Sequence, residues 1–103
     1  MSDEIVFSEP VGTITVPAAT LVRIVARAAE VVDGARVRRP RRNVDVEVAG
    51  ASATVSLRLA ARYGVVLPEL AEAVQAEVTG ALEKMCELDV RTVDVSVEEL
   101  VER

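Results

Sequence analysis

The stretch LRLAARYGVVLPELAEAVQAEVTGALEKM, Leu57–Met85, decides the fold. It contains a strand, a break at Tyr63-Gly64 and a long amphipathic helix that begins at Pro68. Apolar residues recur along it at three- and four-residue steps: Leu67, Leu70, Ala71, Val74, Val78, Ala81, Leu82 and Met85. This spacing places them on one helical face. Proline suits the first helical position because its missing N–H would have no partner there. The sequence therefore predicts a helix over 68–85.

The rest of the chain supplies elements that cover this helix. A second helix is predicted from Pro17 to about Asp33, where Asp33-Gly34 is a stop signal. Alternation of polar and apolar residues predicts strands at 13–16, 43–49, 53–59 and 90–97. The last residues, 98–103, are expected to be helical or frayed.

These elements favour an α+β fold. We expect a two-layer sandwich in β-α-β-β-α-β order, with two helices packed on one face of a small sheet, ferredoxin-like or related. Residues 1–12 show no periodicity and are expected to form a flexible N-terminal arm. Residues 13–103 are expected to form one domain.

The composition limits the function classes. A chain of 103 residues with Cys86 as its one cysteine cannot form an internal disulfide, and it fits a reducing compartment. Because histidine is absent, the commonest metal ligand and the commonest general base are missing. No apolar run approaches the ~20 residues that a membrane-spanning helix needs. We therefore predict no catalytic residue, no metal, no cofactor and no direct membrane insertion.

Arginine is concentrated in one short segment after the first helix. Five arginines stand within seven residues, so the rest of a chain with net charge −5 carries −10. These candidate anion- or partner-binding residues are Arg36, Arg38, Arg39, Arg41 and Arg42. Guanidinium groups bind phosphate and carboxylate through paired N–H bonds. The alternative is a solvated loop that offsets the acidic helices. With Pro40 inside it, the segment is expected to be a loop or a strand entry.

Other candidate groups are interpreted as structural. Paired carboxylates at Asp45/Glu47, Glu69/Glu72 and Glu98/Glu99 fall on predicted solvent faces, whereas acid–base catalysis needs a sheltered cleft. Cys86 is expected to be a buried, inert thiol. Tyr63 is expected to be packed, since the chain has few large groups to fill space.

Several stretches resemble the alkaline-shock-protein family of small bacterial envelope-stress proteins over about residues 12–98. The matching pieces are Gly12–Val16, Val32–Gly34, Val44–Val48, Tyr63–Glu69 and Val93–Val97. The junction Tyr-Gly-x-x-x-Pro-Glu before a Val-rich helix is the most specific piece. The chain departs from the family pattern at Val16-Pro17 and in the arginine segment.

The resemblance implies a non-enzymatic, cytoplasmic protein of cell-envelope homeostasis. Such proteins self-assemble, which implies a homo-oligomer, and some are held near the membrane by a membrane-anchored partner protein. The arginine-rich composition of Arg36–Arg42 indicates an alternative function, that of an anion- or nucleic-acid-binding regulatory domain. Nucleic acid is disfavoured by the net charge and by the lack of aromatic residues on the predicted open sheet face, and it stays an alternative.

Overall fold

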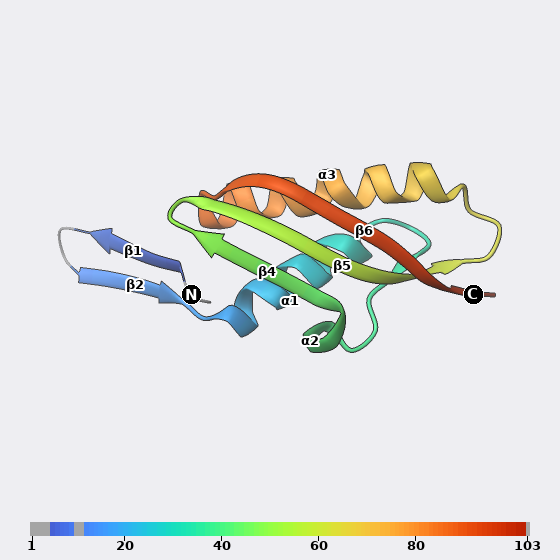
Figure 1. Ribbon diagram of the computed structural model, residues 1–103, viewed down its shortest axis with the longest axis horizontal. Coiled ribbons are helices and arrows are strands. Elements are labelled where there is room, and N and C mark those ends of the chain that lie inside the picture. The colour runs from blue at the N-terminus through green and yellow to red at the C-terminus, as the bar shows by residue number, and fades with distance from the viewer. Residues whose placement is uncertain (1–4, 10–11, 103) are drawn as a thin grey trace.

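The computed structural model describes residues 5–9 and 12–102 (Figure 1). Two long helices, α1 (Ala18–Glu30) and α3 (Leu67–Cys86), lie on one face of a sheet. The strands of that sheet are β3 (Ala35–Arg36), β4 (Val44–Ala49), β5 (Ser52–Arg62) and β6 (Asp89–Val101). The α+β class and the two layers are as expected.

Strand β5 is the centre of the sheet. Strand β6 runs parallel to it from Ser52 to Arg62, with α3 as the crossover connection. Strand β4 pairs antiparallel with Ser52–Leu57, and β3 pairs antiparallel with Ala60 and Ala61. Because β6 occupies the other edge of β5 along its whole length, β3 and β4 share one edge. That edge is interrupted opposite Arg58 and Leu59.

The β4–β5 hairpin turns at Gly50-Ala51, where Gly50 has φ +62°. A two-residue hairpin turn needs such a positive φ, which glycine adopts at little cost. The turn sets the register in which Val44 faces Leu57 and Val48 faces Ala53, so that both strands present their apolar residues to the helices.

The core lies between the sheet and the helices and is aliphatic, as the composition predicts. Its largest fully buried side chains are Leu21, Leu57, Leu59, Leu82, Val25, Val44, Val55, Val74 and Val78. Each such burial contributes roughly 1.5–3 kcal/mol before the entropy of folding is counted. The opposite sheet face carries polar residues, of which Asp45, Glu47, Thr54, Asp94 and Ser96 are exposed.

The N-terminal part corrects two expectations. Where no regular structure was expected before residue 13, Ile5–Glu9 forms strand β1. It pairs antiparallel with β2 (Gly12–Val16), so the first predicted strand belongs to a separate hairpin and not to the main sheet. Figure 1 shows this hairpin beyond the end of the sheet. The division into an arm at 1–12 and one domain at 13–103 stays a prediction.

Two further boundaries differ from the expectation. Helix α1 ends at Glu30, three residues before Asp33. Strand β6 continues to Val101, so the expectation of a helical or frayed end from residue 98 was wrong for Glu98–Val101. Across the described ranges 5–9 and 12–102, we find no helix with the length and apolar character that crossing a membrane requires.

Candidate binding site at the arginine segment

The arginine segment, Arg36–Arg42, is anchored by a buried residue near its start. Val37 is 7% exposed, and its N–H donates to Oε2 of Glu30 at 2.9 Å. Because successive side chains of an extended chain point to opposite sides, Arg36 and Arg38 are turned outward. The bond to Glu30 at the end of α1 therefore helps to hold the backbone between these two arginines.

Pro40 begins the one-turn helix α2 (Pro40–Asn43), where a loop or a strand entry was expected. Proline is compatible with a first helical position, so its presence did not exclude this turn. The residue before it, Arg39, has φ +46°, an uncommon conformation for a residue other than glycine. Its carbonyl accepts the backbone N–H groups of Arg42 at 2.8 Å and Asn43 at 3.1 Å.

Asn43 and Arg58 hold the segment against the sheet. The Asn43 amide nitrogen donates to the carbonyl oxygens of Arg38 at 2.5 Å and Arg39 at 3.5 Å. Its oxygen accepts from Nε of Arg58 at 3.2 Å, and a second Arg58 nitrogen donates to the carbonyl of Arg42. The α2 turn thus fills the interruption in the β5 edge, since Arg58 stands at that position of β5.

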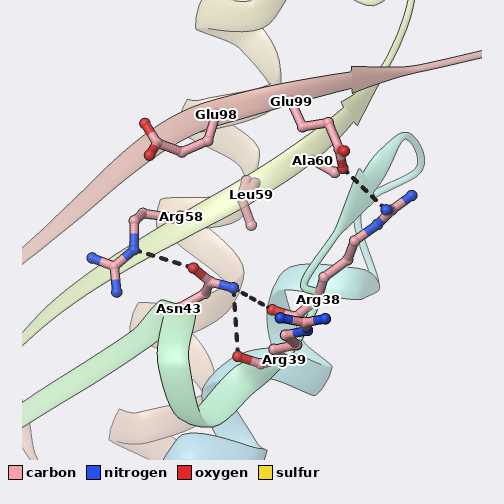
Figure 2. A pocket seen from close by; sticks show the side chains of 8 residues that line it. All are labelled: Arg38, Arg39, Asn43, Arg58, Leu59, Ala60, Glu98 and Glu99. Carbon is pink, nitrogen blue, oxygen red and sulfur yellow. Dashed lines mark hydrogen bonds and ion pairs between the residues drawn. The ribbon is translucent and has the colours of Figure 1, made fainter.

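A hollow of about 250 Å³ opens beside these contacts. Figure 2 shows the side chain of Glu99 of β6 pointing toward Arg38. Their ion pair joins Oε1 of Glu99 to a guanidinium nitrogen of Arg38 at 3.2 Å. Its charged lining residues are Arg38, Arg39, Arg58, Glu98 and Glu99. The hollow therefore has mixed charge, with one more cation than anions.

The structure brings together only part of the candidate set. Arg38 and Arg39 line the hollow, whereas Arg36, Arg41 and Arg42 do not. All five side chains are exposed. Among the described residues, Arg38 is the only one of the five with an ion-pair partner. Positive charge that is not neutralised locally is what an anionic ligand or an acidic protein surface would recognise.

Asn43 and Arg58 shape this candidate site, and sequence reasoning missed both of them. The sequence placed Arg58 only within the strand predicted at 53–59, and Asn43 only at the start of the strand predicted at 43–49. Neither position carries a local signal, because their contact joins residues fifteen positions apart. Arg58 also lies 3.5 Å from Asp45.

For the remaining candidate residues, one expectation was wrong and two are confirmed. Tyr63 is 71% exposed, so the expectation that it is packed was wrong. Cys86 is buried as expected, and burial raises the pKa of its thiol. The three carboxylate pairs are exposed as expected, and no charged or polar residue among those described is buried.

The fold and the site define a small two-layer α+β domain whose charged groups lie at its surface. The model of the alkaline-shock-protein family, which is described by a cell envelope-related function, matches residues 11–102. The chain therefore belongs to this family, and the resemblance found in its sequence is confirmed. No curated protein matches the chain.

Solved structures of MamM-CTD are similar in fold. A double variant superposes with TM-score 0.63 at 21% identity, covering 79% of this chain and 92% of that one. The nickel form of one variant superposes with TM-score 0.62 at 21% identity, and the manganese form of another with TM-score 0.62 at 20% identity. Each match covers 79% of this chain and 96% of the other chain. At this identity the likeness concerns the fold alone, and it agrees with the ferredoxin-like or related class expected. Within the described part of this chain, no group of three or more Cys, Asp or Glu side chains could hold a metal ion.

Proposed function

We propose that this chain is a non-catalytic interaction module of cell-envelope homeostasis that acts by self-association and by contacts with other proteins. The family match supports the link to the envelope. The observation that carries the mode of action is strand β6. It has thirteen residues, and in the described part of the chain it pairs only with β5. A long strand with one unpaired edge is a template for a strand from another chain.

The proposed location is the cytoplasm, with recruitment to the membrane through a membrane-anchored partner. A lone cysteine with a buried thiol is compatible with a reducing compartment. Fractionation of the native host tests this proposal. The protein should be found with the membranes when the partner is present and in the soluble fraction when the partner gene is deleted.

Light scattering across a concentration series tests self-association. We expect the mean mass to rise with concentration above that of the 11.0 kDa chain. A mass equal to one chain at every concentration would contradict the proposal.

A second candidate function is anion binding by the arginine segment. It is favoured by Arg36, Arg39, Arg41 and Arg42, which have no ion-pair partner among the described residues. Their exposed guanidinium groups could bind phosphate groups or an acidic protein surface. Binding of this kind weakens steeply as salt concentration rises.

Two triple variants with the same change in net charge test this second function. One changes Arg39, Arg41 and Arg42 to Gln, and the control changes the exposed Arg23, Arg27 and Lys84 to Gln. If the arginine segment is the site, only the first variant loses binding to anionic vesicles or to an oligonucleotide. Equal losses would indicate a general charge effect, and no binding by the unmodified chain would exclude the function.

A further inference from the structure

The described sheet has two open edges. Strands β4 and β6 each pair only with β5, so each could receive a strand from a second copy of the chain. The residues of the two edges differ in charge. Side chains directly opposite each other in an antiparallel pair lie close together, so like charges at opposite positions are destabilising. The charges of the two edge strands therefore predict which edge joins two copies.

The central registers of strand β4 against itself oppose like charges. Its outward residues are Asp45 and Glu47, while Val44, Val46 and Val48 face the helices. A pairing centred on Val46 would place Asp45 opposite Glu47 of the other copy. A pairing centred on Asp45 or on Glu47 would place that carboxylate opposite itself. These registers, which keep the apolar face aligned, are therefore all repulsive.

Strand β6 has a regular central part between two irregularities. The register with β5 shifts between Ala53 and Thr54 and again between Leu59 and Ala60, which leaves Arg91 and Glu98 as extra residues of β6. Between them, Thr92–Val97 pairs without interruption. Val93, Val95 and Val97 are partly buried toward the core, and Thr92, Asp94 and Ser96 are exposed.

One register of β6 against itself avoids like charges and aligns the valines. In an antiparallel pair centred on Val95, Val93 lies opposite Val97 and Asp94 lies opposite Ser96. Beyond this segment, Arg91 of one copy comes near Glu98 and Glu99 of the other, at both ends. A pair centred on Asp94 would place the Asp94 side chains of the two copies opposite each other. A pair centred on Ser96 would place Asp94 of one copy opposite Glu98 of the other. Both registers are repulsive.

The other registers that keep the valines on one face are less favourable. A pair centred on Val93 leaves Val97 without a partner valine and brings Arg91 opposite Val95. A pair centred on Val97 brings Glu99 opposite Val95. Only the register centred on Val95 combines matched valines with opposite charges at the ends.

We propose that two copies of this chain join through β6 in an antiparallel pair centred on Val95, which extends each sheet into one continuous sheet. This inference rests on the proposed self-association and names its surface, its register and its twofold symmetry. A twofold pair uses the same surface of both copies, so it closes as a dimer.

A hollow and an outward-facing carbonyl lie beside this edge. A hollow of about 340 Å³ runs between α3 and β6, with Gln75, Thr79, Arg91 and Asp94 among its lining residues. The Gln75 amide nitrogen donates to the carbonyl of Val93 at 3.0 Å, so this carbonyl is accessible from outside the β5–β6 ladder. A carbonyl has two lone pairs and can accept a second bond from an incoming strand.

The charges at the ends can change partners at low cost. Arg91 now pairs with Asp89 at 3.1 Å, and Glu99 pairs with Arg38 at 3.2 Å. All four side chains are at least half exposed. Exposed ion pairs contribute little to stability, so their exchange for contacts between copies does not oppose the dimer.

Opposite charge changes at Ser96 test the register. Ser96→Asp places a carboxylate opposite Asp94 of the partner copy at two symmetric positions, and we expect dimerisation to weaken roughly tenfold. Ser96→Lys should strengthen it by a similar factor, and the double variant Asp94→Lys/Ser96→Asp should restore it. Within one chain, Ser96 is paired with Arg58 of β5, so Ser96→Asp gains an internal attraction and should keep the fold. Thermal unfolding of each variant checks this.

A disulfide test locates the contact directly. Chains carrying Asp94→Cys are mixed with chains carrying Ser96→Cys under mild oxidation, and we expect a cross-linked dimer from the mixture. Neither variant alone should cross-link efficiently, because identical positions are diagonal in this register and too far apart for a disulfide. Cys86 is buried in the unmodified chain, so it should not compete.

The outcomes separate this inference from the proposed function. A chain that is monomeric at every concentration contradicts both. Oligomers that do not respond to the Ser96 variants, and that form no cross-link in the mixture, contradict the β6 surface while self-association stands. Cross-linking by Asp94→Cys alone would contradict the register centred on Val95.

Discussion

Arg62 and Asp33 form a two-pronged ion pair between the end of β5 and the turn after α1. One guanidinium nitrogen donates to Oδ1 at 3.0 Å and the other to Oδ2 at 2.9 Å. The backbone N–H of Arg62 also donates to the carbonyl of Gly34 at 2.8 Å. The hydrogen bonds from Arg62, and then its positive charge, lower the pKa of Asp33 below its ordinary value of 3.8.

This pair predicts a dependence of stability on pH. Because the pKa of Asp33 is lower in the folded than in the unfolded chain, its contribution is fully present above the unfolded pKa. It is lost as pH falls through the folded pKa. Urea unfolding of the wild type and of Asp33→Asn should differ by a constant amount above about pH 5 and converge below it. A difference that does not change with pH would contradict the assignment.

Alanine at two glycines should have opposite effects. Gly34 has φ +92°, and an added Cβ would lie 3.0 Å from Cγ1 of Val65. Gly34→Ala should therefore destabilise the fold by more than about 1 kcal/mol. Gly80 lies within α3 with nothing within 4 Å of an added Cβ. Gly80→Ala should stabilise by roughly 0.5–1 kcal/mol, because it removes the cost of glycine in a helix. Denaturant midpoints of the two variants measure both effects.

Two neighbouring positions of α3 provide a matched test of the core. Leu82 is fully buried, so Leu82→Ala should lower the free energy of unfolding by about 2–5 kcal/mol through lost burial and a new cavity. Met85 is 66% exposed, and Met85→Ala should change the free energy of unfolding by no more than about 0.5 kcal/mol. Similar losses for both would show that α3 is rotated from its described position.

Removal of the Asn43 side chain should loosen the arginine segment. Asn43→Ala removes the bonds to the carbonyls of Arg38 and Arg39 and the acceptor for Arg58. We expect a loss of about 1–2 kcal/mol and faster amide exchange over residues 38–43. Asp45→Asn is the control, since it removes only the longer contact to Arg58. Unchanged exchange in Asn43→Ala would mean that the backbone of α2 holds the segment without it.

The thiol of Cys86 should react slowly in the folded chain. It is 3% exposed, and burial raises its pKa, so the thiolate fraction and access are both low. Labelling with an aromatic disulfide reagent should be at least roughly tenfold slower than in the urea-unfolded chain, with a rate set by local opening. Equal rates would contradict burial at the end of α3.

Local periodicity was enough to predict the principal helix and the faces of the strands. Helix α3 was predicted over 68–85 and spans Leu67–Cys86, because its apolar residues keep a helical period. Leu67 and Met85, which were placed on its apolar face, are exposed at its two ends. The end of α1 was predicted less well. Val32 continues the apolar pattern and packs against the core, although it lies beyond the helix. A side chain can be buried from a turn as well as from a helix, and the pattern does not distinguish the two.

Pairing over long distances in sequence was not predictable from these patterns. The segment that ends at Val16 has the alternation of a sheet member, yet β2 pairs with β1 and leaves β5 to β3, β4 and β6. The arginine segment was recognised by composition, whereas its anchor Arg58 was not, because their contact depends on how β5 and α2 are placed. The exposure of Tyr63 was not predicted, because the sequence does not indicate whether an aromatic side chain at a turn points toward the core or toward solvent.

The central position of β5 also determines the order in which the sheet can assemble. Its hairpin with β4 closes through two residues, whereas its parallel partner is separated from it by the twenty-residue helix α3. Contacts between residues distant in sequence form later, since more chain entropy must be lost first. During folding, the edge of β5 that pairs with β6 therefore stays unpaired for longer than the edge that pairs with β4. In that interval, a β6 segment from a neighbouring chain could pair with this edge by domain swapping.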